Sequence, residues 1–182
     1  MKIRWSAFNL YLLAFAFLLG CKSPQEKMDS AEARRHKKDL TSLRVHLEAG
    51  NSGPSRAQTV SILRATPMLI KVENDSLLDE RDLVRASVMD YLGGFVIQLQ
   101  FDDHGSLVLD STSLANKGKR VAVMCEFGEQ RWLAAPVMSN RITDGSLTFT
   151  PDATRDEAVR IVRGLNNTVA RLKRQDSFLP GW

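Results

Sequence analysis

The middle of this 182-residue chain is dominated by short segments in which apolar and polar residues alternate. In the clearest segment Phe95, Ile97, Leu99 and Phe101 occupy every second position. Because successive side chains of a strand point to opposite faces of a sheet, this spacing predicts a half-buried β-strand. Strands should therefore supply most of the core. Further strands are predicted at 43–47, 59–63, 68–72, 83–88, 131–137 and 147–150. A nearly continuous apolar run at 120–126 suits a central strand.

The last apolar segment has helical spacing instead. Thr154 and Glu157 are placed as a capping box, in which the hydroxyl and the carboxylate satisfy free N–H groups at the start of a helix. A shorter helix is predicted at 106–116, with Gly118 at a C-cap position. Two helices on a strand-rich chain predict an α+β fold, a two-layer sandwich of mostly antiparallel sheet with two helices. The apolar face of the last helix comprises Ala158, Ile161, Val162, Leu165, Val169 and Leu172.

Residues 1–21 have the pattern of a secretory signal. Two basic residues precede an apolar run at 5–19, which is short for a membrane span. The run ends in Leu-Leu-Gly-Cys at 18–21, which resembles the lipobox of bacterial lipoproteins, where a lipid is attached to the cysteine thiol and the chain is cut before it. A lipoprotein signal peptide with lipidation of Cys21 is therefore predicted. The alternative is an uncleaved anchor, and both interpretations place the rest of the chain outside the cytoplasm.

Charge and cysteine content limit the partners of the chain and the means by which it is stabilised. Of 25 Lys and Arg residues, Lys2 and Arg4 belong to the signal, which leaves 23 basic residues against 21 acidic ones. The resulting net charge of +2 gives no reason to expect a nucleic-acid partner. With Cys21 committed to lipid, Cys125 is the only other cysteine. A disulfide within the mature chain is thus excluded, and packing must provide the stability.

The mature chain divides into three segments. Residues 22–40 are polar and charged and are interpreted as a tether between the lipid and the folded part. Residues 41–76 hold N-terminal strands, which are expected to pack on the main domain. Within them, the Asn-Ser-Gly-Pro-Ser break at 51–55 separates two strands. Residues 77–182 are expected to form the main α+β domain.

Residues with catalytic or metal-binding chemistry are few and scattered. His46 is assigned to the polar face of a strand. Asp102, Asp103 and His104 together offer metal-ligand atoms, but a solvated turn before a helix explains them as well. Cys125 lies on an apolar strand and is interpreted as a small hydrophobic residue rather than a nucleophile. We therefore predict no enzyme activity, no catalytic residue, no metal and no cofactor.

Several segments, in order, resemble the head of the large periplasmic P1 region of the protein-export membrane protein SecD. Residues 78–83 are similar to the opening of that head, and Asn-Lys-Gly-Lys-Arg-Val-Ala-Val at 116–123 resembles its "GK-LAI" strand. Trp-Leu-Ala-Ala-Pro-Val at 132–137 resembles its "SAPV" strand, and 142–158 its closing segment. The resemblance runs from Leu77 to about Leu172. It implies a ferredoxin-like α+β head domain and supplies no catalytic residues.

The same resemblance shapes the expected function. SecD also carries transmembrane helices that use the proton gradient to help exported chains leave the translocon, and this chain is expected to lack that motor. What remains is a non-enzymatic, lipid-anchored envelope domain that binds extended or unfolded polypeptide, or an export or envelope partner. The alternative is a structural envelope lipoprotein that assembles through a sheet edge. Lys22 stands where lipoproteins retained in the inner membrane commonly have Asp, which favours the outer membrane.

Overall fold

The structure is a computed structural model that describes residues 39–50 and 56–177. The predicted signal peptide, Cys21, nearly all of the tether and the break at 51–55 lie outside these residues, so they stay predictions. The described part contains the helices α3 and α4 and nine strands. No helix among these residues is both long enough and apolar enough to cross a membrane.

The strands follow the predicted segments, with small shifts at their ends. β5 continues past 88 to Tyr91, β8 ends at Ala134 rather than at 137, and the two-residue β4 was not predicted. Their bounds are β1 (Ser42–Leu47), β2 (Ala57–Ile62), β3 (Met68–Glu73), β4 (Leu78–Asp79), β5 (Leu83–Tyr91), β6 (Gly94–Phe101), β7 (Val121–Glu126), β8 (Gln130–Ala134) and β9 (Ser146–Phe149).

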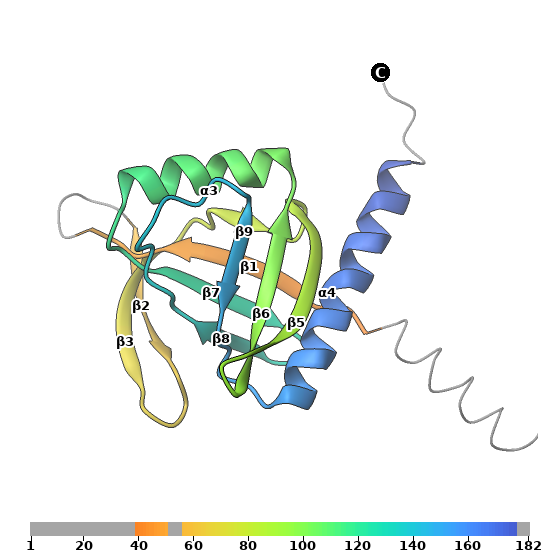
Figure 1. Ribbon diagram of the computed structural model, residues 1–182, viewed down its shortest axis with the longest axis horizontal. Coiled ribbons are helices and arrows are strands. Elements are labelled where there is room, and N and C mark those ends of the chain that lie inside the picture. Colours follow the sequence, from red (N-terminus) through yellow and green to blue (C-terminus); the bar gives the residue numbers. More distant parts are fainter. Residues whose placement is uncertain (1–38, 51–55, 178–182) are drawn as a thin grey trace, which may run out of the picture. The chain divides into compact units, whose positions relative to one another are not determined.

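These strands form three antiparallel sheets (Figure 1). The largest has the order β4-β1-β7-β8, a second has the order β5-β6-β9, and β2 and β3 form a hairpin. The hairpin is joined to the end of β1 by a bridge between Glu48 and Val72. The predicted α+β sandwich with antiparallel strands and two helices is confirmed, and its strands are divided among three sheets.

The main core lies between the two larger sheets and α4. Ile97 and Leu99 of β6 are fully buried, as the alternation of that segment predicts. They meet Val121 and Val123 of β7 from the opposite sheet in the same apolar cluster. Helix α4 contributes side chains from the predicted apolar face, of which Ala158, Ile161, Val162, Leu165 and Val169 are buried.

A second apolar cluster covers the other face of β7. The β2–β3 hairpin contributes Val60, Ile62, Ile70 and Val72, which pack around Ala122. Since both faces of β7 are covered, its nearly continuous apolar run is explained as that of a central strand.

His46 of β1 lies under the hairpin, so the strand face to which it was assigned is covered rather than polar at this residue. The side chain is only 4% exposed. Its Nδ1 lies 2.9 Å from the carbonyl oxygen of Glu73, and its ring centroid lies 5.3 Å from that of Trp132. The alternation along β1 marks one buried face, but it carries no information about a hairpin that covers the other.

Both helices begin at a side chain that binds free backbone N–H groups. In α4 (Arg155–Asp176) the predicted capping box is confirmed, with Glu157 N donating to Thr154 Oγ1 at 3.2 Å and Thr154 N donating to Glu157 Oε2 at 2.8 Å. Helix α3 (Asp103–Ala115) begins before the predicted residue 106, because Asp102 is its N-cap and accepts a hydrogen bond from Gly105 N at 2.8 Å.

Helix α4 is attached to the start of β1 at one close contact. Thr168 Oγ1 donates to Thr41 O at 2.8 Å and accepts from Thr41 N at 3.2 Å. One turn earlier on the helix, a Cβ on Gly164 would lie 2.1 Å from Thr41 Oγ1 and 3.0 Å from Thr41 Cβ. Thr41 is buried, so it has little room to move away. The missing side chain of Gly164 is therefore what allows β1 to approach α4.

We expect Gly164→Ala to destabilise the domain by about 1–3 kcal/mol, the usual cost of overpacking. In an open helical position the same change would stabilise by roughly 0.5–1 kcal/mol, because alanine is the better helix former. Urea unfolding followed by circular dichroism measures the difference. The double variant Gly164→Ala, Thr41→Gly removes the clash and should lose less stability than the two single changes added together. A stabilised Gly164→Ala variant would contradict the contact.

Candidate functional site

Strand β9 is the edge of its sheet and presents unpaired backbone toward one side. Phe101 N donates to Gly145 O at 2.9 Å, and the antiparallel ladder then pairs Leu99 with Leu147 and Ile97 with Phe149. Because hydrogen-bonded pairs alternate along such a ladder, the N–H and C=O groups of Thr148 point away from β6. In the part of the chain that the structure describes, these two groups have no backbone partner.

Two hollows follow β9 along its length. The first, of about 350 Å³, lies between Ser146–Thr148 and the segment 136–142. The second, also about 350 Å³, continues past Phe149 and Thr150. Both are lined by Pro136, and we call them together the β9 groove.

The two halves of the groove differ in chemistry. The first half is lined by the polar residues Gln98, Asn140 and Asp144 and by the apolar residues Val121 and Leu147, whose side chains are buried in the main core. The second half is mostly apolar, and its lining includes Ile62, Leu63, Met68, Ala134, Ala135 and Phe149. An extended chain with both polar backbone and apolar side chains matches such a lining.

Helix α3 holds the outer wall of the groove in place. Ile142 N donates to Ser113 Oγ at 2.9 Å, and Arg141 Nη2 donates to Asp110 Oδ2 at 2.8 Å. The hydrogen bond from Arg141 keeps the pKa of Asp110 below its ordinary value, so this carboxylate stays ionised and the pair stays formed at neutral pH. The wall is thus tied to α3, and backbone hydrogen bonds of Pro136 and Met138 also join it to residues 118–121.

Other sheet edges are closed by side chains or loops. Asn166 of α4 donates to Ala86 O and accepts from Ala86 N, both at 2.9 Å, as a neighbouring strand would at the edge of β5 (Figure 1). The backbone of Asp152 donates to Leu133 O at 2.7 Å and covers the edge of β8. β4 has only two residues. β9 and β2 are the described edge strands of four or more residues for which no such bond on the outward side is found.

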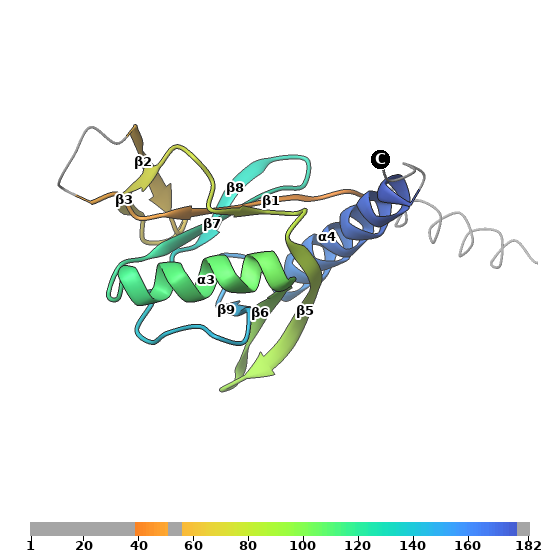
Figure 2. The same cartoon turned by 90° about the horizontal axis from the view of Figure 1, so that it is seen from above.

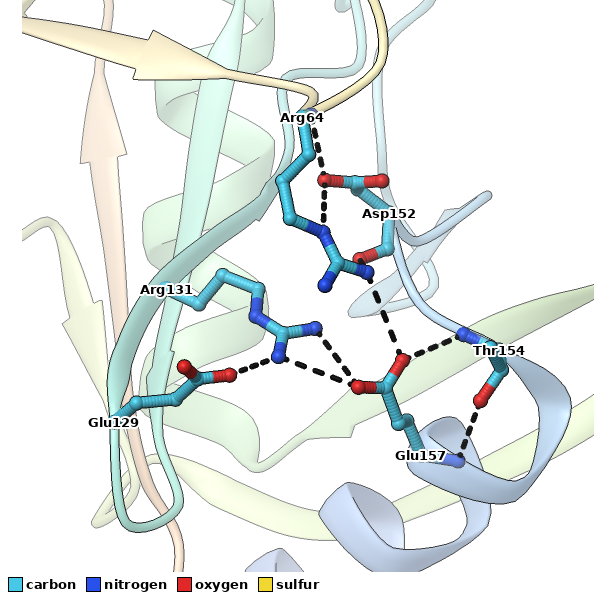
Figure 3. Close-up of polar contacts among 6 residues, drawn as sticks. All are labelled: Arg64, Glu129, Arg131, Asp152, Thr154 and Glu157. Atoms are coloured by element: carbon cyan, nitrogen blue, oxygen red, sulfur yellow. Dashed lines mark hydrogen bonds and ion pairs between the residues drawn. The ribbon is translucent and has the colours of Figure 1, made fainter.

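A cluster of charged side chains, joined by the N-cap Thr154, connects the β2–β3 turn to the start of α4 (Figure 3). The members of this charge cluster are Arg64, Glu129, Arg131, Asp152, Thr154 and Glu157. Arg64 donates from N and Nε to Asp152 Oδ2 at 2.9 and 3.2 Å, and its Nη2 lies 3.7 Å from Glu157 Oε2. Since Arg64 directly follows Leu63, these bonds fix the turn that forms one wall of the apolar half of the groove.

Glu157 is the centre of the charge cluster. Its Oε1 accepts from Nη1 and Nη2 of Arg131 at 3.4 and 3.3 Å, and Arg131 also binds Glu129. The hydrogen bond from the Thr154 backbone, followed by the one from Arg131, lowers the pKa of Glu157 from 4.5 to about 2. A carboxylate held this firmly in its ionised form is a weak base. Its position is explained by helix capping and by ion pairing, and it makes a poor proton acceptor for catalysis.

The residues considered for metal binding are only partly brought together. Ligand atoms of Asp82, Asp102 and His104 lie within 4.8 Å of one another, and Asp103 is not among them. Each carboxylate already has a structural partner: Asp82 Oδ1 lies 2.8 Å from His104 Nδ1, Asp82 Oδ2 accepts from Asp79 N at 3.0 Å, and Asp102 caps α3. The positive end of the helix dipole there also disfavours a cation.

Cys125 lies in the main core, as its apolar strand predicts. It is 1% exposed, and burial, reinforced by the negative charge of Glu80, raises the pKa of its thiol to about 12. Almost no thiolate is present at neutral pH, so Cys125 is inert as a nucleophile.

Two solved structures of SecDF share this fold. The first is a structure of SecDF, described as a membrane component that enhances protein export. It aligns with a TM-score of 0.54 and 19% sequence identity, and the alignment covers 82% of this chain and 71% of the SecDF chain. The second is SecDF in a super-membrane-facing form, with a TM-score of 0.53 at 19% identity, over 80% of this chain and 21% of that one. No protein-family model and no curated protein sequence matches this chain. The predicted resemblance to SecD is confirmed as a likeness of fold.

We expect Glu157→Gln to lower the free energy of unfolding by about 1 kcal/mol at neutral pH, because glutamine keeps the capping hydrogen bond but loses the charge that pairs with Arg131 and with the positive end of the helix dipole. The folded-state pKa of about 2 lies below the ordinary value of 4.5. The stabilisation is therefore complete above about pH 4.5 and is lost as the pH falls toward 2. Urea unfolding at a series of pH values measures it, and the two proteins should converge at low pH.

Asp156→Asn is the matched control for this measurement, because it removes an exposed charge from the same helical turn without a bond to Arg131. The control should stay close to the native protein across the series. A stability difference for Glu157→Gln that does not change between pH 7 and low pH would contradict the assigned ion pairing.

Proposed function

We propose that this protein is a non-enzymatic, lipid-anchored envelope domain that binds extended or unfolded polypeptide along β9. The observation that carries the proposal is the open edge at Thr148 beside the β9 groove. A polypeptide in extended conformation adds to such an edge by backbone hydrogen bonds, and the adjoining hollows receive its alternate side chains. Backbone pairing is independent of sequence, which suits a domain that handles many different chains.

The groove has the properties that such binding needs. Its apolar half offers Leu63 and Met68 to the side chains of a ligand, while Thr148 offers one N–H and one C=O. The wall formed by 136–142 is fixed to α3, so little conformational freedom is lost when a ligand binds. The likeness to SecDF, a component described as enhancing protein export, supports the handling of exported chains outside the membrane.

The anchored location in the proposal rests on the sequence. The lipobox-like residues at 18–21 place the lipid on Cys21, with 22–40 as the tether. Lys22 favours the outer membrane over the inner one. The domain then lies in the periplasm or outside the cell.

A second function is supported by the other open edge. β2 pairs only with β3 among the described strands, and most of its side chains are exposed. On the neighbouring strand Leu69 is 70% exposed. A structural envelope lipoprotein would use this edge to assemble with copies of itself or with other envelope proteins.

The polypeptide-binding proposal predicts that Thr148→Pro weakens binding by about tenfold, which corresponds to one lost backbone hydrogen bond of about 1.4 kcal/mol. Proline removes the outward N–H group of residue 148 but no bond to β6, and proline is tolerated on strand edges. Fluorescence anisotropy of a labelled, permanently unfolded polypeptide, such as reduced and carboxymethylated lactalbumin, measures the affinity.

Thr148→Val is the control, because it changes the same side chain and keeps the N–H group. It should bind like the native protein. Hydrogen exchange of the native chain gives an independent test, since the amide of Thr148 should exchange more slowly when the polypeptide is bound. Equal affinities for the proline and valine variants, with an unchanged exchange rate at Thr148, would exclude β9 as the binding edge.

From the proposed lipid anchor we expect a clickable fatty acid, supplied to growing cells, to be incorporated into the native chain but not into the Cys21→Ala variant. The thioether-linked lipid needs the thiol of residue 21, so alanine removes the attachment point. Gel fluorescence after the click reaction measures the labelling. Cys125→Ala is the control and should keep the full signal. An unlabelled native chain would remove the lipid anchor from the proposal.

A further inference from the structure

The β5–β6 hairpin ends in an exposed group of large apolar side chains. Leu92 is 89% exposed, Tyr91 is 60% exposed and Met89 is 39% exposed. We call these three residues the hairpin tip. Figure 2 shows the hairpin projecting beyond the sheets and helices, so the tip is free on several sides. None of the three belongs to either apolar cluster of the domain.

The backbone conformation of Leu92 is also unusual for a leucine. Tyr91 pairs with Gly94, so Leu92 and Gly93 form a two-residue turn with φ values of +45° and +76°. Both central residues are left-handed, a turn that strongly favours Asn-Gly because asparagine and glycine tolerate positive φ. Leucine has no short polar group to compensate. Leu92 therefore supports neither the turn nor the core.

Leu63 provides an instructive comparison. It is the other described residue besides glycine with positive φ, at +68°. Its side chain is 37% exposed and lines the apolar half of the β9 groove. Leu63 thus contributes to the wall of the groove, whereas Leu92 lines none of the hollows found among the described residues.

We propose that the hairpin tip inserts into the interfacial layer of the bilayer to which the chain is anchored, and so orients the domain on the membrane. This step rests on the proposed lipid anchor. An aliphatic side chain beside an amphipathic tyrosine is the combination that suits the boundary between headgroups and acyl chains. A narrow, convex tip reaches into a fluid layer, but it offers little of the flat area that a stable protein interface needs.

The region behind the tip also suits a headgroup layer. Arg155 at the start of α4 binds Asp90 of β5, and its side chain remains 56% exposed. A guanidinium in this position can face lipid phosphates while it stays paired with Asp90. The backbone groups that β5 and β6 share within the hairpin are already paired with each other, so shallow insertion of the tip does not break these hydrogen bonds.

The tether explains how so small a tip is effective. Residues 22–38 span at most about 60 Å when fully extended, at roughly 3.5 Å per residue. A domain held within that distance of a bilayer experiences a high effective concentration of lipid, so weak insertion is enough to bias its orientation.

The test places an environment-sensitive fluorophore on the tip. The acylated full chain with Leu92→Cys is labelled with an NBD maleimide and reconstituted into vesicles of phosphatidylcholine and phosphatidylglycerol. Cys125 is buried, so it does not compete for the probe. Leu107→Cys is the matched control, because Leu107 on α3 is also a leucine with a largely exposed side chain, at 67%.

We expect the probe at residue 92 to shift its emission to shorter wavelength and to lose most of its intensity when brominated lipids are included. The probe at residue 107 should remain quenchable by aqueous iodide. Vesicles that carry the protein while residue 92 keeps its aqueous emission would overturn the insertion and leave the anchor intact. Equal quenching at 92 and 107 would also overturn it, because the domain would then contact lipid without a preferred face. Protein that fails to float with the vesicles would overturn the anchor and the insertion with it.

Discussion

The structure depends on the burial of β7 from both sides. Each residue from Val121 to Cys125 is buried, although alternate side chains point in opposite directions. One face of the strand meets β6 and α4 in the main core, and the other is covered by the β2–β3 hairpin. A strand of this kind cannot be exposed to water on either face. The hairpin is therefore an integral layer of the fold, and β1, β8 and the helices must arrange themselves around the same strand.

This arrangement determines which backbone remains available for binding. β7 is central, so the polar groups of its sheet are paired, and the edges that remain are short or covered. Asn166 takes the place of a strand beside Ala86, and the backbone of Asp152 covers Leu133. At β9 the groove walls stand away from the strand and leave Thr148 accessible. Exposed sheet edges promote aggregation, and most edges of this domain are covered or short. The open edge of β9 lies beside an apolar hollow, which is consistent with a binding role for that edge.

Local signals in the sequence predict the elements well, and contacts between distant residues are what they miss. The alternation in β6 and the capping box of α4 are each contained within a few residues, and both are confirmed. The burial of His46 depends on Trp132 and Glu73, and the short contact between Asp82 and His104 joins a loop to a helix. The β9 groove is likewise assembled from segments around 62–68, 134–142 and 146–150. No periodicity or motif connects these segments, so the groove was not predictable from the sequence.

The turn between β2 and β3 belongs to both the charge cluster and the groove. Leu63 adopts a left-handed backbone conformation that disfavours leucine, and it lines the apolar half of the groove. The next residue, Arg64, is held by Asp152 and approaches Glu157, which also caps α4 and binds Arg131. Ion pairs at a partly exposed site contribute little to overall stability, but they select one conformation of a strained turn. The cluster therefore matters more for the shape of the groove than for the stability of the domain. Loss of Arg64 would release the wall at Leu63 while the core around β7 remained intact.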